Sequence, residues 1–212
     1  MSNRPNVLLL FSDEHRHDAM GCAGHERVKT PHLDALAENG TRFTQAFTPS
    51  PICVPARAAL ATGQYVHQNR CWSNAEAYSG DPVSWGHHLI EQGHRVDSIG
   101  KLHYRGGETH NGFEEEILPL YIRNGVGWIK GLLRDHEAFF DVSSYVREIG
   151  PGSDRYTDYD LGVTRAARQW LSDAGQAASE KPWVLFVSWL RPHYPLTCPP
   201  EYYDLYPLDK MD

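Results

Sequence analysis

A cysteine and an arginine, four residues apart, mark the segment with the clearest potential for chemistry. In the stretch PSPICVPARAALATGQY, Cys53 and Arg57 begin a helical pattern that runs to about Thr62, with Pro55 in the first turn, where proline is tolerated. Residues four apart share one face of a helix, so the thiol and the guanidinium are expected to lie side by side. A helix N-terminus with an added guanidinium favours anions and is expected to lower the pKa of a thiol placed there. A cysteine nucleophile acting on an anionic substrate is one interpretation, and a buried small hydrophobe, a metal ligand and a precursor of another group are the others.

Further polar residues stand where three predicted strands end. Asp13 and Glu14 follow the first strand, Lys101 ends the second with His103 two residues on, and His193 follows the third. Ligands of open α/β sheets bind at the carboxyl ends of the strands, so these side chains converge if the strands are parallel neighbours. Each group also has a simpler interpretation alone: the acids as turn or N-cap residues, the lysine and histidine as an exposed strand end, and His193 as a structural loop residue.

The chemistry of these residue types is specific. Adjacent carboxylates such as Asp13 and Glu14 suit Ca²⁺ or Mg²⁺. Lys101 and His103 point the same way if their segment is extended, and an ammonium beside an imidazole can hold an anion and move a proton. His193 lies between two prolines, where a stiff backbone aims the side chain.

Apolar patterns predict the elements that position these groups. Asn6–Phe11 and Trp183–Leu190 are continuous apolar runs, typical of central strands in a sheet covered on both faces, and His94–Lys101 is a weaker third candidate. Strands that alternate with helices indicate an α/β fold. The helical patterns lie at residues 31–39, 83–92 and 157–174.

The second half of the chain combines the longest helical pattern with an irregular stretch. Thr157 is expected to open that helix, with Asp160 three residues on as in a capping box, and Gly175 to close it. Gly106–Gly152 is rich in glycine and aromatic residues and is interpreted as an insertion or a substrate-facing loop. Its aromatic residues either stack on a sugar or aryl group or pack internally; they include Tyr121, Trp128, Phe139 and Phe140.

Length and composition exclude several classes of protein. With 212 residues, 41% of them hydrophobic, the chain can form one large domain, and its formal net charge of −7 argues against a nucleic-acid partner. The four cysteines form no CxxC pair, which argues against a zinc ribbon and a disulfide scaffold. The apolar run before Ser12 is shorter than a signal peptide or a membrane helix requires, so we expect a cytoplasmic protein without a membrane partner.

Read in order, these segments resemble the sulfatase family. Cys-x-Pro-x-Arg at residues 53–57 resembles the formylglycine signature of that family, and CVPARAALATGQY resembles its extended form. NVLLLFSDEHRHDAMGCAG is similar to the first strand and metal loop, VKTPHLDALAENGTRFTQAFTPSPIC to the segment before the cysteine, GKLH to the Gly-Lys-x-His motif, and RPHYPLTCPPEYYDLY to the His-x-Pro loop. The resemblance is weakest from about Gly106 to Gly152. It implies an alkaline-phosphatase-like α/β fold with a mixed, mostly parallel sheet sandwiched by helices, of which residues 1–212 are the N-terminal part.

The resemblance also implies an activity and its cofactors. Cys53 would be converted to formylglycine by a maturation enzyme, and the protein would hydrolyse the sulfate ester of a small molecule or a saccharide. A divalent metal, Ca²⁺ first and Mg²⁺ or Mn²⁺ as alternatives, would be held by Asp13, Glu14 and residue 53 and would activate the hydrated aldehyde for attack on sulfur.

The remaining residues take roles from the same resemblance. Arg57 would steady the hydrated aldehyde, and Lys101 would bridge it to the sulfate. His103 would be the base that releases sulfate, and His193 would contact the sulfate or protonate the leaving oxygen.

Two departures from the family pattern keep other functions open. Position 14 is Glu, where relatives commonly have Asp or Gln. The family takes further metal ligands and a second lysine from a segment downstream of the His-x-Pro loop, so residues 1–212 alone are expected to hold metal poorly and to be inactive. A phosphonate monoester or phosphodiester hydrolase, a non-catalytic binding module and an enzyme using the unmodified Cys53 thiol are the alternatives.

Overall fold

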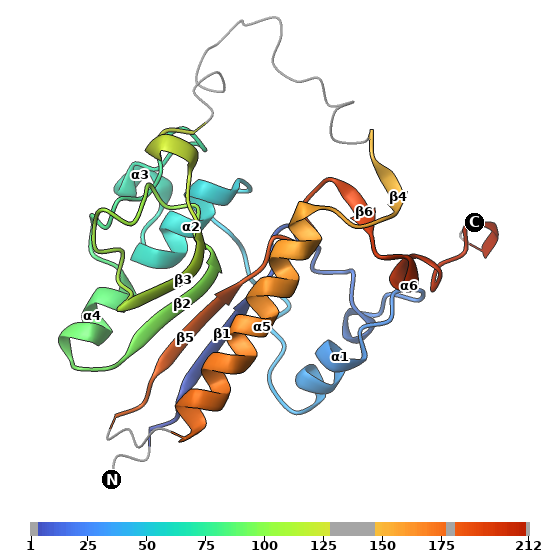
Figure 1. Ribbon diagram of the computed structural model, residues 1–212, viewed down its shortest axis with the longest axis horizontal. Helices are drawn as coiled ribbons and strands as arrows, with labels where there is room; N and C mark the ends of the chain where they lie inside the picture. Colours follow the sequence, from blue (N-terminus) through green and yellow to red (C-terminus); the bar gives the residue numbers. More distant parts are fainter. Residues whose placement is uncertain (1–3, 128–146, 177–180, 211–212) are drawn as a thin grey trace, which may run out of the picture.

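The core of the fold is a four-stranded parallel sheet, seen in a computed structural model that describes residues 4–127, 147–176 and 181–210. The strand order is β1-β5-β2-β3, and every pairing in this sheet is parallel (Figure 1). Two short strands, β4 and β6, pair in parallel beside it. The strands are β1 Val7–Phe11, β2 Val96–Lys101, β3 Glu115–Leu120, β4 Ile149–Pro151, β5 Val184–Ser188 and β6 Leu196–Cys198.

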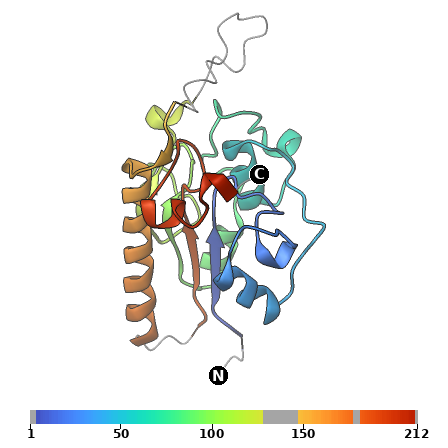
Figure 2. The same cartoon turned by 90° about the vertical axis from the view of Figure 1, so that its right-hand side faces the viewer.

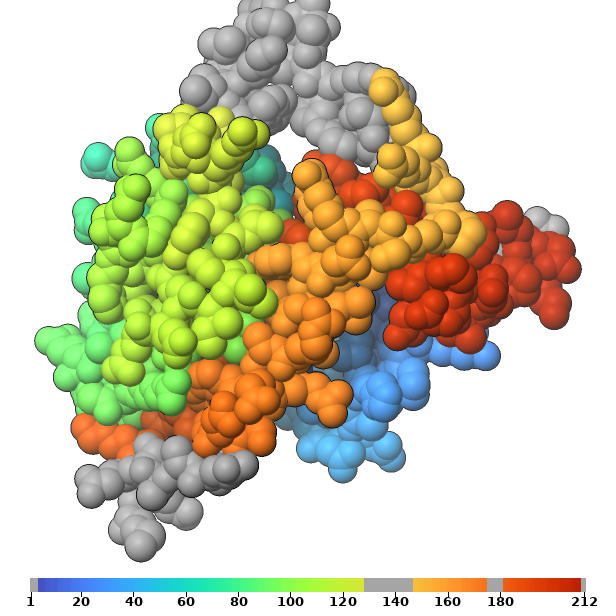
Figure 3. Space-filling view, viewed as in Figure 1, coloured from blue at the N-terminus to red at the C-terminus, as the bar shows by residue number. Residues whose placement is uncertain are grey.

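Helices cover both faces of the sheet. The long helix α5 lies against one face, and α2 and α4 pack on the other (Figures 1 and 2). In the space-filling view α5, in orange, crosses its face of the molecule (Figure 3). The predicted α/β sandwich is therefore confirmed. The helices are α1 Pro31–Glu38, α2 Cys53–Thr62, α3 Val66–Asn69, α4 Trp85–Glu91, α5 Arg155–Gln176 and α6 Pro200–Tyr203.

Strand β5 is the central strand of the core. Its residues alternate between the two faces, with Val184 and Phe186 in the cluster beneath α2 and α4, and Leu185 and Val187 in the cluster beneath α5. All its residues are buried, as a continuous apolar run predicts for a central strand. On the α5 side, Trp170 donates its indole N–H to the buried carboxylate of β2 at 2.8 Å, an anchor between helix and sheet.

The same expectation is wrong for β1. This strand pairs only with β5 among the described residues, and Val7 and Leu10 are 48% and 54% exposed. A continuous apolar run indicates a strand covered on both faces, whereas β1 has a partner strand on one side only within the described residues. The run therefore predicted the strand and not its place in the sheet.

Strand β3 was not predicted and lies within Gly106–Gly152. It pairs with β2 through a register shift, and it contains Leu118, whose φ is +50°, followed by Pro119. These irregularities remove the period-two pattern that identifies a strand from sequence. Tyr121, next to this strand, donates to Glu116 and packs on the core, so it is a packing residue. The other three aromatic residues of that prediction, Trp128, Phe139 and Phe140, lie outside the described residues.

Helix α5 begins two residues before the predicted Thr157. Its first turn is capped by Asp154, whose carboxylate accepts from the backbone N–H of Tyr156 at 2.8 Å and of Thr157 at 3.0 Å. The predicted capping box of Thr157 with Asp160 is wrong, because Asp160 accepts instead from the backbone after β5.

The four cysteines, all within the described residues, form no disulfide. No helix in the described ranges combines the length and the apolar character needed to cross a membrane.

Candidate active site

The carboxyl ends of three strands meet at one edge of the sheet. Ser188 at the end of β5 is in register with Phe11 of β1 and Gly100 of β2. The approach is close: a Cβ on Gly100 would lie 2.1 Å from the carbonyl oxygen of Ser188, so only glycine fits there. The side chains that follow these strands are thereby brought together, as the sequence predicted.

Helix α2 brings Arg57 to this edge. Its Nη1 donates to the carbonyl oxygen of Lys101 at 2.6 Å and to the hydroxyl oxygen of Ser188 at 3.0 Å, and its guanidinium lies 5.0 Å from the centre of the Phe11 ring. Arg57 is 3% exposed, and its Nε and Nη2 have no hydrogen-bond partner. The Arg57 side chain thus attaches α2 to three strands. Its Nε and Nη2 still donate no hydrogen bond.

The carboxylate of Asp13 lies among these cations. It is in contact with Lys101 Nζ and lies 3.6 Å from Arg57 Nη2. Asp13 is 6% exposed and Lys101 is 1% exposed. Two buried cations against one buried carboxylate leave a net positive charge, which favours an anionic ligand.

Cys53 is the first residue of α2 and faces the same cluster. Its Sγ lies 3.8 Å from Asp13 Oδ1 and 3.8 Å from Lys101 Nζ. The expectation of a lowered thiol pKa is wrong: burial raises the pKa of Cys53, and the opposing effect of Lys101 is smaller. A protonated thiol is a poor nucleophile, which disfavours an enzyme that uses unmodified Cys53.

His103 reaches the site from a turn and not from an extended segment. Strand β2 ends at Lys101, and His103 has a φ of +54°. The backbone N–H groups of Leu102 and His103 both donate to the carbonyl oxygen of Leu120 at the end of β3. Burial lowers the pKa of His103 to about 2, with further lowering by the neighbouring cations, so the ring is neutral. Its Nδ1 is buried without a partner.

His193 lies in the loop after β5. Its Nδ1 hydrogen-bonds the carbonyl oxygen of Tyr194 at 2.7 Å, so Nδ1 carries the proton in the neutral ring. The other nitrogen, Nε2, lies 3.5 Å from Glu14 Oε1. Direct contacts therefore link six of the residues singled out from the sequence, namely Asp13, Glu14, Cys53, Arg57, Lys101 and His193. His103 is near enough for the charges of Lys101, Arg57 and His193 to lower its pKa.

Comparison with known proteins identifies the family of this chain. The model of the sulfatase family matches residues 5–212, nearly the whole chain. The chain belongs to the sulfatase family. It is 29% identical over 215 residues to the choline-sulfatase of Rhizobium meliloti (strain 1021), a match that covers 97% of this chain and 41% of that protein.

Solved structures place this sulfatase chain in the alkaline-phosphatase-like fold. The phosphonate monoester hydrolase of Agrobacterium radiobacter matches with a TM-score of 0.66 and 25% identity, over 95% of this chain and 44% of that one. A protein solved with its substrate D-glucosamine-2-N,6-O-disulfate matches in fold, with a TM-score of 0.64 and 24% identity, over 90% of this chain and 35% of that one. The sulfatase chain thus spans less than half the length of these relatives.

The acidic side of the sulfatase site partly fits a divalent metal. Ligand atoms of Asp13, Cys53 and His193 all lie within 4.8 Å of one another. Glu14, predicted as a ligand, is not in that group but lies beside His193. Two carboxylates suit a hard cation such as Ca²⁺ and are fewer than its usual six to eight oxygen ligands. Asp13 belongs to the group of potential ligand atoms and Glu14 does not, so the two predicted carboxylates alone do not complete a metal site.

Three residues that support the sulfatase site were not predicted. Ser188 is a polar end to an apolar strand, a signal that was available in the sequence. Asn74 accepts from the backbone N–H of Val54 at 3.0 Å and so caps α2 from a distant segment, and Leu120 holds the turn of His103 through its carbonyl oxygen. Neither of the last two contacts leaves a sequence signal, because each depends on the fold.

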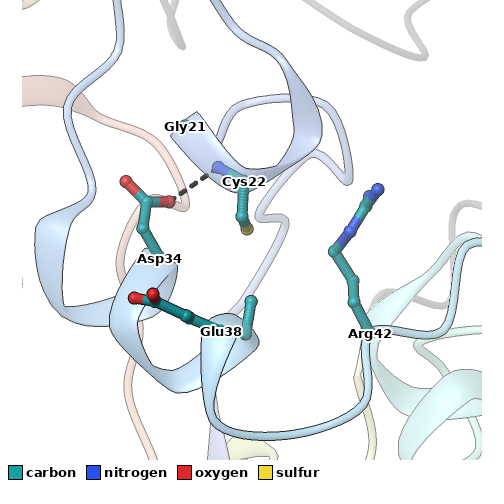
Figure 4. Close-up of a pocket in the computed structure, with 6 residues that line it drawn as sticks. Gly21, Cys22, Asp34, Glu38 and Arg42 are labelled. Atoms are coloured by element: carbon teal, nitrogen blue, oxygen red, sulfur yellow. Dashed lines mark hydrogen bonds between the residues drawn. The ribbon is translucent and has the colours of Figure 1, made fainter.

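A pocket of about 550 Å³ is lined by none of these residues and lies along the middle and the C-terminal end of α1 (Figure 4). Asp34, from α1, accepts from the backbone N–H of Cys22 at 2.7 Å and from the Thr30 hydroxyl at 2.9 Å. These hydrogen bonds attach α1 to the segment before it, so Asp34 has a structural role at this pocket. Its lining residues are Gly21, Cys22, Asp34, Ala37, Glu38 and Arg42.

Proposed function

We propose that this chain provides the N-terminal half of a site that hydrolyses sulfate esters, with formylglycine in place of Cys53. The observation that carries the proposal is the position of Cys53, 3.8 Å from both Asp13 Oδ1 and Lys101 Nζ. A group there is within reach of a carboxylate and an ammonium that contact each other. The thiol itself is a poor nucleophile in this place because its pKa is raised.

The chemistry that residue 53 lacks would come from two groups. A formylglycine and a divalent cation held by Asp13 and Glu14 would supply, when present, a hydroxyl nucleophile and a Lewis acid. We expect Ca²⁺, with Mg²⁺ or Mn²⁺ as alternatives, because the donors are carboxylates. A maturation enzyme is then a required partner.

Lys101 and Arg57 bind and orient the anion. Arg57 is already fixed by Lys101 and Ser188, and its Nη2 and Nε, which donate no hydrogen bond, are the donors left for a ligand or for residue 53. Since both cations are buried, their charges act on a sulfate with little screening by water. Preorganised donors of this kind cost no reorganisation during the reaction.

Two histidines would move protons. His103 is neutral and its Nδ1 has no hydrogen-bond partner, so Nδ1 is the atom available to accept the proton whose removal releases sulfate, provided that the negative charge of the bound group offsets the burial and the cations that lower its pKa. His193 has Nδ1 occupied by Tyr194, so Nε2 is the atom that would contact the sulfate, and it can deliver a proton to the leaving oxygen only when the ring is an imidazolium with both nitrogens protonated. Separate acid and base roles follow from these different environments.

The substrate class rests on the relatives. A choline ester and a sulfated glucosamine are named for two of them, so we propose a sulfate ester of a small molecule or a saccharide. The phosphonate monoester hydrolase of the same fold makes phosphonate monoesters the second candidate, because the cationic site does not distinguish the two kinds of anion by charge alone.

The rate of hydrolysis of an aryl sulfate and of an aryl phosphonate monoester tests this proposal. The protein would be produced with a maturation enzyme and assayed as the wild type, as Cys53→Ala and as the matched control Cys198→Ala, a thiol outside the site. We expect sulfate to be preferred, Cys53→Ala to lower kcat/KM by about 10³-fold or more, and Cys198→Ala to have little effect. Preference for the phosphonate would support the second candidate, and equal rates for both variants would contradict the proposal.

A further inference from the structure

Arg191 lies at the centre of the loop that carries His193. Its Nη1 donates to the carbonyl oxygens of His193, at 3.1 Å, and of Pro195. The loop therefore curls around the guanidinium. On the other side of the fork, Nη2 donates to three side-chain oxygens, those of Asp154 at 2.7 Å, Thr157 at 3.2 Å and Thr197 at 3.1 Å.

Asp154 connects this arginine to the start of α5. Its Oδ1 accepts from two backbone N–H groups of the first helical turn, and its Oδ2 accepts from Arg191 and from the hydroxyl of Thr197. The carboxylate is thus both the helix cap and the partner of Arg191. Because the Asp154 carboxylate is held by the first turn of a 22-residue helix, it gives Arg191 a rigid partner.

A second carboxylate of the same helix holds the backbone of the loop. Asp160 accepts from the N–H of Leu190 at 2.8 Å and from the N–H of Arg191 at 2.9 Å. The N–H of His193 in turn donates to the carbonyl oxygen of Leu190 at 3.0 Å. The main chain of Arg191 is therefore bound to Asp160 of α5, and its side chain is bound to Asp154 at the start of that helix. His193 is bound to Arg191 through its carbonyl oxygen and to Leu190 through its N–H.

We propose that Arg191 is a positioning residue that holds the His193 ring toward Glu14 and the Asp13 cluster. Each of its Nη atoms is engaged by protein acceptors, so Arg191 acts through His193 and not on the substrate. A lysine cannot replace it, because an ammonium is a single point and cannot reach carbonyls on one side and a carboxylate on the other. The catalytic consequence rests on the proposed function of His193, whereas the structural part does not.

A double-mutant cycle between Arg191 and His193 tests the functional part. In the mature, full protein, Arg191→Lys is expected to lower kcat/KM for an aryl sulfate by up to about a hundredfold through misplacement of the ring. The same change in a His193→Ala background should lower it by less than about threefold, because the ring it positions is gone. Arg168→Lys, an exposed arginine on α5, is the matched control and should leave both backgrounds unchanged. An equal effect of Arg191→Lys in both backgrounds would overturn the proposal.

Amide hydrogen exchange tests the structural part without activity. Arg191→Lys should speed exchange at Leu190, Arg191 and His193 by about tenfold or more while exchange in β5 stays unchanged, and Arg168→Lys should do neither. Unchanged exchange at these amides would contradict the positioning role. If the wild type hydrolyses neither ester, the proposed function fails, and the exchange result alone decides whether Arg191 holds the loop.

Discussion

Arg57 donates a 2.6 Å hydrogen bond to the carbonyl oxygen of Lys101, so a side chain of α2 binds the main chain at the end of β2. The two residues that the resemblance assigns to contacts with the hydrated aldehyde are thus linked directly. Because the same Nη1 also reaches Ser188, the guanidinium stabilises the edge of the sheet as well as the site.

The first prediction follows from this double role. Arg57→Ala leaves the Asp13 carboxylate with one cation fewer in a buried place, and it removes two hydrogen bonds. We expect the free energy of unfolding, measured by urea titration, to fall by about 3 kcal/mol. Arg165→Ala, an exposed arginine of α5, is the control and should change it by less than about 0.5 kcal/mol. A similar loss in both variants would argue against a structural role for Arg57.

The second prediction concerns the acidic side of the site. Calcium at about 10 mM should raise the unfolding midpoint of the protein by mass action, and Asp13→Asn should abolish this rise. Asp18→Asn changes an exposed carboxylate that pairs with Arg16, and it should leave the rise intact. A calcium effect that survives Asp13→Asn would place the metal elsewhere.

The third prediction is a pH dependence carried by His103. Its pKa is about 2 in the folded protein, below the ordinary value of an imidazole, about 6.5. Below about pH 6.5 the His103 ring takes up a proton in the unfolded protein but not in the folded protein. The stability that the neutral, buried ring contributes is therefore present above about pH 6.5 and is lost as the pH falls below it. Between pH 7.5 and 5 the wild type should lose of the order of 1–2 kcal/mol more than His103→Gln in urea unfolding. Parallel pH profiles would show that His103 is not buried as a neutral ring.

The fourth prediction concerns Asp154 at the start of α5. Burial raises its pKa, but the hydrogen bonds from Thr197, the helix N-terminus and Arg191 outweigh that effect and lower the pKa to about 2. The contribution of Asp154 is thus present above about pH 4 and is lost as the pH falls toward 2. Between pH 5 and 3, the free energy of unfolding of Asp154→Asn should fall by about 1 kcal/mol less than that of the wild type. Asp158→Asn, an exposed neighbour in the helix, is the control, and an unaltered limb in Asp154→Asn would contradict this account.

Much of the fold could be predicted because its signals are local. The runs at Val7–Phe11 and Val184–Ser188 and the helix Cys53–Thr62 are visible in composition and turn residues, and all three form. The convergence of the polar residues followed from one rule, that the ends of parallel strands meet at one edge.

The rest depends on tertiary contacts that leave no local pattern. Leu118 and Pro119 break the alternation of β3, so a strand that supports His103 looks irregular in sequence. The Cys53 thiol has a raised pKa because burial, which the sequence does not show, exceeds the effect of Lys101. Asp160 follows a threonine at the spacing of a capping box, yet it binds the loop after β5.

The most direct test of the account is the mass of the tryptic peptide FTQAFTPSPICVPAR, Phe43–Arg57, from the protein in its native host. The account predicts the loss of sulfur and the gain of an aldehyde oxygen at Cys53, with Cys198 in the same sample still an alkylatable thiol. An intact thiol at Cys53 in active protein would contradict the account, because the catalytic group would then be the cysteine itself.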